Sequence, residues 1–84
     1  MTVKLPANYA RFFRELGREI RAGRAARKWT QEDMLSHGFN VRHWQRMEGG
    51  QPINMVTLLR VCDALEIPVE KLVADVAPHL RRRN

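Results

Sequence analysis

The chain has 84 residues, a length that predicts one small domain. It carries 15 Lys and Arg against 9 Asp and Glu, for a net charge of +6 and an isoelectric point of about 10.7, and this balance favours polyanionic partners. Apolar residues make up 44% of the chain, which excludes a basic disordered tail and indicates a chain that folds.

Several classes of function are disfavoured by what the sequence lacks. Cys62 is the single cysteine and cannot close an intramolecular disulfide, which favours a reducing, cytoplasmic setting. No apolar run approaches the roughly 20 residues of a membrane span, so no membrane partner is expected. The histidines stand at no metal-ligand spacing, and motifs of phosphate loops and hydrolases are absent. We therefore expect no enzyme, with no catalytic residues, no metal and no cofactor.

Residues 8–27 predict a long first helix, because their apolar side chains recur with the i, i+3, i+4 spacing of one buried face. These apolar residues are Tyr9, Phe12, Phe13, Leu16 and Ile20. A second stripe, off the apolar face, is formed by Arg11, Arg14, Arg18 and Arg21. For each of these arginines, a solvated position and a contact with a phosphate are both open alternatives.

Arg24 continues the apolar line instead of the basic one, since it follows Ile20 by four residues and Leu16 by eight. Its guanidinium is therefore predicted at the edge of the core. A charge there is costly unless it is paired and hydrogen-bonded, so we expect a carboxylate from elsewhere in the chain to meet it.

Two short helices joined by a tight turn follow, which is the arrangement of a helix-turn-helix. Thr30 is a suitable N-cap for the first, with acidic residues in its first turn, and Gly38 ends it within about two turns. Asn40 is a suitable N-cap for the second, which is expected over about 41–48. An apolar residue before each cap can pack onto the following turn, and these pairs are Trp29 with Met34 and Phe39 with Trp44.

Two more helices complete the predicted fold. Asn54 caps a helix whose inward positions are Met55, Leu58, Leu59, Cys62 and Leu65. Pro68 suits the first turn of the last helix, which ends at Pro78 and whose inward residues are Leu72, Val73 and Val76. Five helices on short loops predict an all-α fold. We expect a single domain over 1–84, with an N-terminal arm at 1–7 and a basic C-terminal tail at 79–84.

The helix at 41–48 has no acidic residue before Glu48, and it carries Arg42 in its first turn. A helix N-terminus without carboxylates of its own suits an external anion such as a phosphate. Helix periodicity turns Phe39, Trp44 and Met47 inward and leaves four donor-rich side chains outward: Arg42, His43, Gln45 and Arg46. Arg can bridge guanine and Gln can bridge adenine in the major groove, so these residues form a candidate surface for reading DNA. The alternative is an ordinary solvated helix.

The order and spacing of several short motifs point to one family. They are Leu16-Gly17, Ile20-Arg21, Arg24, Trp29-Thr30-Gln31-Glu32, Met47-Glu48, Gly50, Thr57-Leu58-Leu59 and Ala64-Leu65. Over about 16–72 the chain thereby resembles the lambda-repressor-like, Cro/cI-type helix-turn-helix proteins, also called the XRE family. This resemblance implies a five-helix lambda-repressor-like DNA-binding domain with the helix-turn-helix at helices 2 and 3.

The resemblance also implies roles for individual residues. Gln31 matches a glutamine that touches the DNA backbone and braces the reading helix. Glu48 matches a glutamate that meets an arginine at the place of Arg24, which supplies the partner that this arginine needs. The positions that contact phosphates or base edges are matched by Asn40, Val41, Arg42 and Arg46, with Gln45 beside them.

The sequence departs from the family pattern between Gln31 and Glu48, where it has one residue fewer. Leu35 and Trp44 also replace smaller residues inside helices 2 and 3. The missing residue is expected to remove part of the end of helix 2. The two larger side chains are expected to push the helices apart or to fill the gap between them.

These observations predict a sequence-specific regulator of transcription that binds double-stranded DNA as a homodimer, on a palindrome with half-site centres about 34 Å apart. In that docking geometry the end of the first helix lies near phosphates, with Arg24, Arg27 and Lys28, whereas the stripe at Arg11, Arg14 and Arg18 faces away. The dimer contact is expected in the last helix, unless its apolar residues simply cap the core; these are Val69, Val73, Val76 and Leu80.

Two alternatives belong to other classes of function. The chain could be the antitoxin of a toxin-antitoxin pair, which binds both DNA and a protein toxin. Association of the basic first helix with a membrane surface is a weaker hypothesis, because the apolar face of that helix is needed for the core.

Overall fold

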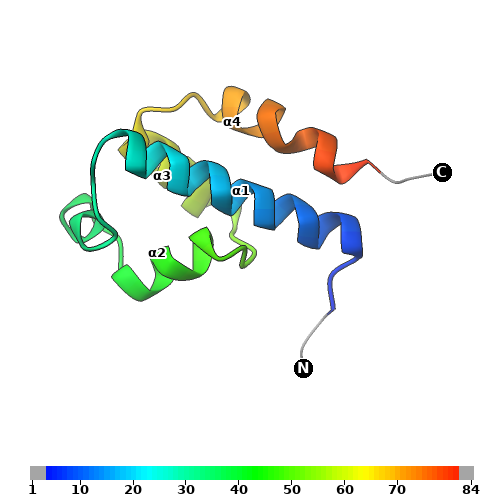
Figure 1. Cartoon of the computed structure of the whole chain (residues 1–84), viewed down its shortest axis with the longest axis horizontal. Helices are drawn as coiled ribbons and strands as arrows, with labels where there is room; N and C mark the ends of the chain where they lie inside the picture. The colour runs from blue at the N-terminus through cyan, green and yellow to red at the C-terminus, as the bar shows by residue number, and fades with distance from the viewer. Residues whose placement is uncertain (1–3, 82–84) are drawn as a thin grey trace.

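α1 (Ala7–Ala26) is the longest helix and the one against which most of the chain packs (Figure 1). The computed structural model describes residues 4–81, and all regular structure within them is helical. After α1 come η1 (Glu32–His37), α2 (Val41–Glu48), α3 (Met55–Leu65), α4 (Val69–Val76) and η2 (Ala77–Leu80). Because η2 continues α4 directly, the structure has the five helical segments and the all-α fold that the sequence predicts.

The burial of α1 follows its predicted apolar line. Leu16 and Ile20 are buried in the middle of the helix, whereas Tyr9 near its start is exposed. α2 and α4 both contact α1, and in Figure 1 they lie below and above it. The last described turn returns to the start of α1, where the side-chain amide of Asn8 donates to the carbonyl of Leu80 at 2.9 Å.

The predicted second helix is the 3₁₀ helix η1, six residues long. Thr30 makes the predicted capping contacts, since its Oγ1 accepts the backbone N–H of Asp33 at 3.1 Å while the Asp33 carboxylate accepts that of Thr30 at 2.7 Å. The N-cap position of η1 is, however, the next residue, Gln31. Gly38 ends η1 in the left-handed region, with a φ of 87°. Between them Ser36 Oγ donates to the Asp33 carbonyl, three residues back, which suits the tighter winding. The shortening expected here therefore takes the form of a 3₁₀ helix.

Leu35 does not fill the space between η1 and α2, because it is 66% exposed. The expectation that the enlarged residues push the two helices apart or fill the gap between them is therefore wrong for Leu35, whereas Trp44 is completely buried. A 3₁₀ helix has three residues per turn, so an element this short turns few side chains inward, and Met34 is the buried one. Trp29 stacks on His37 with ring centroids 4.4 Å apart.

α2 begins as the sequence predicts. Asn40 Oδ1 accepts the backbone N–H of His43 at 3.0 Å. The rings of Phe39 and Trp44 meet edge to face with centroids 4.9 Å apart, which confirms the predicted apolar pair across the cap. Trp44 and Met47 are inward and fully buried.

α3 is capped by Asn54, whose Oδ1 accepts the backbone N–H of Thr57 at 2.8 Å. Its buried residues are Thr57, Leu58, Val61, Cys62 and Leu65. Met55 and Leu59, which the sequence predicts as inward, are exposed instead. Burial raises the pKa of the Cys62 thiol, and the charges of nearby carboxylates act in the same direction.

The apolar residues of α4 cap the core. Val76 is buried, and Val69 and Val73 are half-buried and pack against the core cluster, which agrees with the alternative that these residues cap the core. Of the residues expected at a dimer contact, only Leu80 is exposed.

The predicted terminal segments also change. α1 begins at Ala7, inside the arm predicted at 1–7, and residues 1–3 lie outside the described part of the chain. Pro78 does not end the helical path but lies in η2, so the tail predicted at 79–84 does not begin at 79. Residues 82–84 are likewise outside the described part.

Candidate nucleic-acid interface

The C-terminal end of α2 rests directly on α1 at Gly17. A Cβ atom at this position would lie 2.5 Å from the carbonyl oxygen of Met47 and 2.7 Å from that of Glu48, closer than real Cβ contacts allow. Glycine is therefore required for the backbones of α1 and α2 to approach this closely.

Arg24 and Glu48 form the ion pair that the sequence predicts. Arg24 Nε lies 2.6 Å from Glu48 Oε2, and Arg24 Nη2 donates to Oε1 at 3.0 Å. The side chains are only 12% and 5% exposed, respectively. A two-point contact of this kind fixes direction as well as distance, so it ties α2 to α1 in one orientation.

Two further side chains complete the coordination of Glu48. Gln31 Nε2 donates to Oε1 at 3.0 Å, and Trp44 Nε1 donates to Oε2. Burial alone raises the pKa of Glu48, but the hydrogen bonds from Arg24, Gln31 and Trp44 and the charge of Arg24 outweigh it, so the pKa lies below its usual value. The hydrogen bond with Glu48 raises the pKa of Arg24. Both groups are therefore held in their charged forms.

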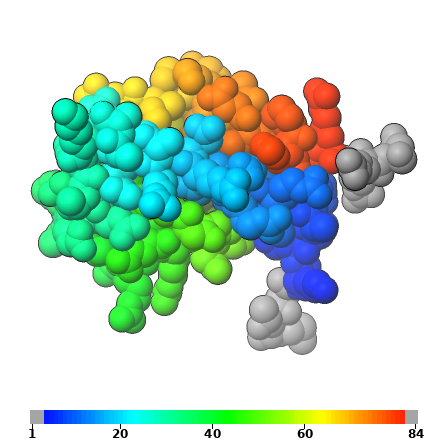
Figure 2. All heavy atoms as spheres, in the orientation of Figure 1, coloured from blue at the N-terminus to red at the C-terminus, as the bar shows by residue number. Residues whose placement is uncertain are grey.

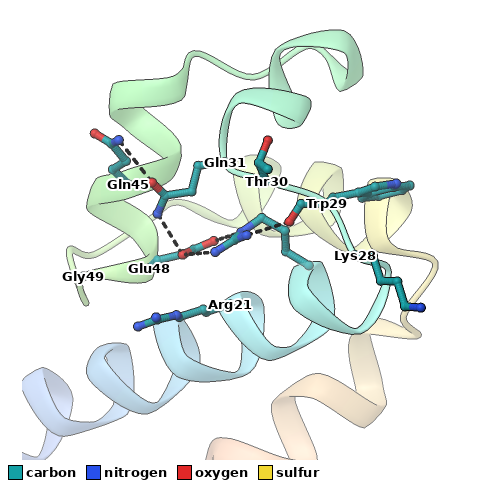
Figure 3. A pocket seen from close by; sticks show the side chains of 9 residues that line it. Arg21, Lys28, Trp29, Thr30, Gln31, Gln45, Glu48 and Gly49 are labelled. Carbon is teal, nitrogen blue, oxygen red and sulfur yellow. Dashed lines mark hydrogen bonds and ion pairs between the residues drawn. The ribbon is translucent and has the colours of Figure 1, made fainter.

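A chain of hydrogen bonds continues from this pair to the surface (Figure 3). Gln45 Nε2, on α2, donates to Gln31 Oε1 at 3.1 Å, and Gln31 in turn donates to Glu48. Gln31 thus braces α2, as the resemblance implies. The Trp44 contact was not predicted, although the spacing of four residues between Trp44 and Glu48 on one helix is its sequence signal.

The outward side of α2 carries the predicted donors. The exposed residues are Asn40, Arg42, His43, Gln45 and Arg46, and Val41 is half-buried. Figure 2 shows side chains of this green segment projecting from the edge of the molecule. Within residues 4–81, no hydrogen bond or ion pair engages the side chains of Arg42, His43 and Arg46. The structure therefore brings these residues together on one face.

The end of α1 is arranged differently from the expectation. Arg27 is turned away from α2, because its Nε donates to the carbonyl of Leu65 at 3.0 Å and its Nη2 lies 3.3 Å from Glu66. Arg24 is committed to Glu48. Arg24 lines a groove between α1 and α2 together with two further basic residues, Arg21 and Lys28 (Figure 3). The other lining residues are Trp29, Thr30, Gln31, Gln45, Glu48 and Gly49.

Comparison with protein-family models, with curated proteins and with solved structures finds no match for this chain. Membership of the lambda-repressor-like family therefore stays a prediction. Among the helices of residues 4–81, none combines the length and the apolar character that a membrane crossing requires. In the same residues, no group of three His, Cys, Asp or Glu side chains could hold a metal ion.

Proposed function

We propose that this protein is a sequence-specific regulator of transcription that binds double-stranded DNA with α2 in the major groove. The observation that carries the proposal is the contrast between the two sides of α2. Its inner side is locked to α1 through Glu48, and its outer side presents Arg42 and Arg46, which take no part in holding the fold. Because an α-helix fits the roughly 12 Å wide major groove, a rigidly held helix with free donors suits base recognition.

The other predicted site residues have donors or apolar surface to contribute. The amide of Gln31 has two N–H donors and gives one to Glu48, so the other is available to a phosphate. The Oδ1 of Asn40 caps α2, which leaves its Nδ2 group for DNA. Val41 can offer apolar contact to a thymine methyl group. The first turn of α2 contains no acidic residue that would repel the backbone.

Selection of bound sequences from random duplex DNA tests the proposal. Arg42→Ala and Arg46→Ala should each lose about 1–3 kcal/mol at the selected site and relax the preference at one base position. Arg18→Ala is the matched control, since Arg18 is exposed on α1 and pairs with Glu15 at 3.1 Å. Equal weakening on every sequence would assign the two α2 arginines to phosphates, and the absence of any enriched sequence would refute the proposal.

The proposed regulator acts as a homodimer. α2 has eight residues and reaches few base pairs, so two copies related by a two-fold axis would double the length of the site. The selected sequence should then be a palindrome with half-site centres about 34 Å apart. Enrichment of a single, isolated half-site would refute the homodimer but would still support α2 as the helix that reads DNA.

One observation favours the antitoxin as a second candidate. α3 exposes Met55, Val56 and Leu59, three apolar residues that are neighbours on one side of the helix and do not serve the core. Such a surface suits a protein contact. Sedimentation of the purified chain separates the cases: a dimer assigns the surface to a second copy, whereas a monomer whose neighbouring gene encodes a co-purifying toxin supports the antitoxin.

A further inference from the structure

Three basic residues mark the edge of α1 that borders α2. Arg14 and Arg21 are seven residues apart, which is close to two helical turns, so they lie on one line along α1. Lys28 lies just beyond the end of α1. We call these three residues the basic edge.

Two contacts place the basic edge beside the proposed DNA-reading helix. A Cβ atom on Gly50, just after α2, would lie 3.0 Å from Cγ of Arg14 and 3.1 Å from its Cα, so this loop lies against Arg14. Arg21 and Lys28 line the same groove as Gln45. Figure 3 shows Arg21 beneath the last turn of α2 and Lys28 at the other end of the groove.

The charges of the basic edge are not neutralised by the protein. Within residues 4–81, the ion pairs involve other basic residues, and none of the three takes part. All three side chains belong to exposed residues. The carboxylate that lines the groove, Glu48, is already bound by Arg24.

The other side of α1 has the opposite character. A second hollow, between α1 and α4, is lined by three carboxylates, those of Glu19, Glu66 and Asp75, with Lys71 as the basic residue. The hollow on the α4 side of α1 is therefore mainly acidic, whereas the groove on the α2 side, where a polyanion bound by α2 would lie, is lined by Arg21 and Lys28.

We infer that the basic edge binds backbone phosphates of the duplex that α2 reads, and that it does so independently of base sequence. This inference rests on the proposed function. From Arg14 to the end of α1 at Ala26 the helix rises about 18 Å, and Lys28 lies just beyond it. This length exceeds the roughly 12 Å width of the major groove, so the basic edge extends past the groove to the phosphates beside it. It replaces the expectation that Arg24 and Arg27 supply these contacts and that the stripe containing Arg14 faces away.

The salt dependence of binding to a mixed-sequence duplex tests the inference. Arg14→Gln, Arg21→Gln and Lys28→Gln should each weaken binding and reduce the slope of log K against log salt by about 0.9, the value for one lost phosphate contact. The triple variant should lose about three times that slope. Arg11→Gln and Arg18→Gln are matched controls, because they remove the same charge from the same helix outside the basic edge, and they should leave the slope unchanged.

Two outcomes overturn the inference. An unchanged slope in the triple variant excludes phosphate contacts by the basic edge. An equal loss in Arg11→Gln or Arg18→Gln shows that total charge, and not this edge, sets the binding. Thermal melting of each variant accompanies the binding assay, and since all these residues are exposed, it should match the wild type.

Failure of the proposed function has a different signature. If the salt slope depends on the basic edge but selection enriches no sequence, the phosphate contacts of the basic edge are supported and the proposal of a sequence-specific regulator is refuted. If selection enriches a sequence, Arg42→Ala loses that preference and the triple variant keeps the wild-type salt slope, the sequence-specific regulator is supported. The phosphate contacts of the basic edge are then refuted.

Discussion

α2 and α4 are both eight residues long and both pack against α1, yet different forces hold them there. α4 is held by apolar side chains, and its ion pair, Lys71 with Asp75, is exposed and lies within the helix itself. α2 also buries apolar side chains, but its last residue, Glu48, is a buried carboxylate that receives four hydrogen bonds from three other residues.

This difference shows which helix is held in a defined orientation. Apolar contact is non-directional and only requires that α4 cover the core. The paired hydrogen bonds from Arg24 are directional and fix how α2 is turned. A helix that reads bases needs that property, because its side chains must meet donors and acceptors at set positions.

The largest expected effect comes from removing the carboxylate that distinguishes the two helices. Glu48→Ala leaves Arg24 unpaired at the edge of the core and should lower the free energy of unfolding by about 3–5 kcal/mol. Asp75→Ala is the matched control, since it removes a paired carboxylate near the end of α4. Asp75 is 44% exposed, so its loss should cost only about 0.3–0.5 kcal/mol. Urea denaturation measures both, and equal losses would contradict the distinction.

A smaller effect is expected from the backbone contact beneath α2. Gly17→Ala places a methyl group against the carbonyls of Met47 and Glu48 and should destabilise the protein by about 1–3 kcal/mol. Gly23→Ala is the control in the same helix. Its new methyl would meet the flexible side-chain ends of Leu65 and Ile67, at 3.2 and 2.9 Å, and alanine favours the helix, so little change is expected. If Gly17→Ala melts like Gly23→Ala, the close approach is not required.

The same carboxylate predicts that the stability of the protein depends on pH. The pKa of Glu48 is lower in the folded state than in the unfolded state, so its contribution is complete above the unfolded pKa and is lost as the pH falls through the folded one. Between about pH 7 and about pH 3, the unfolding free energy of the wild type should fall more steeply than that of Glu48→Gln, which cannot titrate. Parallel curves would show that Glu48 titrates alike in both states.

The smallest effect concerns the charge beside the groove. Glu32 lies close enough to α1 for its charge to raise the pKa of Arg24, so it also repels a phosphate bound there. Two unit charges about 4 Å apart in water interact by about 1 kcal/mol, so removing this weaker repulsion should be worth about 0.5 kcal/mol, and Glu32→Gln should bind duplex DNA about twofold more tightly. Glu19→Gln, on the α4 side of α1, should have no effect. Titration by fluorescence anisotropy distinguishes the two.

The sequence predicts the helices and the ion pair well because both follow local rules. Capping residues and glycines mark the helix ends, and a charge at Arg24 on an apolar line requires a partner. The sequence predicts the position of Leu35 wrongly, because burial is judged from the period of an α-helix and η1 is a 3₁₀ helix. The period of 3.6 residues identifies a face of a helix but not what covers it.

Because helical spacing does not show what covers a face, the sequence also does not predict the surroundings of the apolar residues of α4 and of the arginines of α1. Whether Val69 and Val73 are needed by the core depends on how α4 lies on α1, and this is a property of the assembled fold. Similarly, the spacing of Arg14 and Arg21 shows that they share a face. Gly17 of α1 packs against the end of α2, and Gly50, just after α2, packs against Arg14 of α1. Only these contacts show that this face of α1 borders α2.

Because Cys62, the chain's single cysteine, is buried, its reactivity can report local opening of the native protein. A thiol reacts as its thiolate, and this one is both covered and raised in pKa, so it is modified only when α3 separates from the core. The rate of labelling by a thiol reagent then measures that opening. A ligand that binds only the folded state suppresses opening in proportion to its concentration and affinity, so the labelling rate of one native sulfur atom tests the proposed DNA binding without any introduced probe.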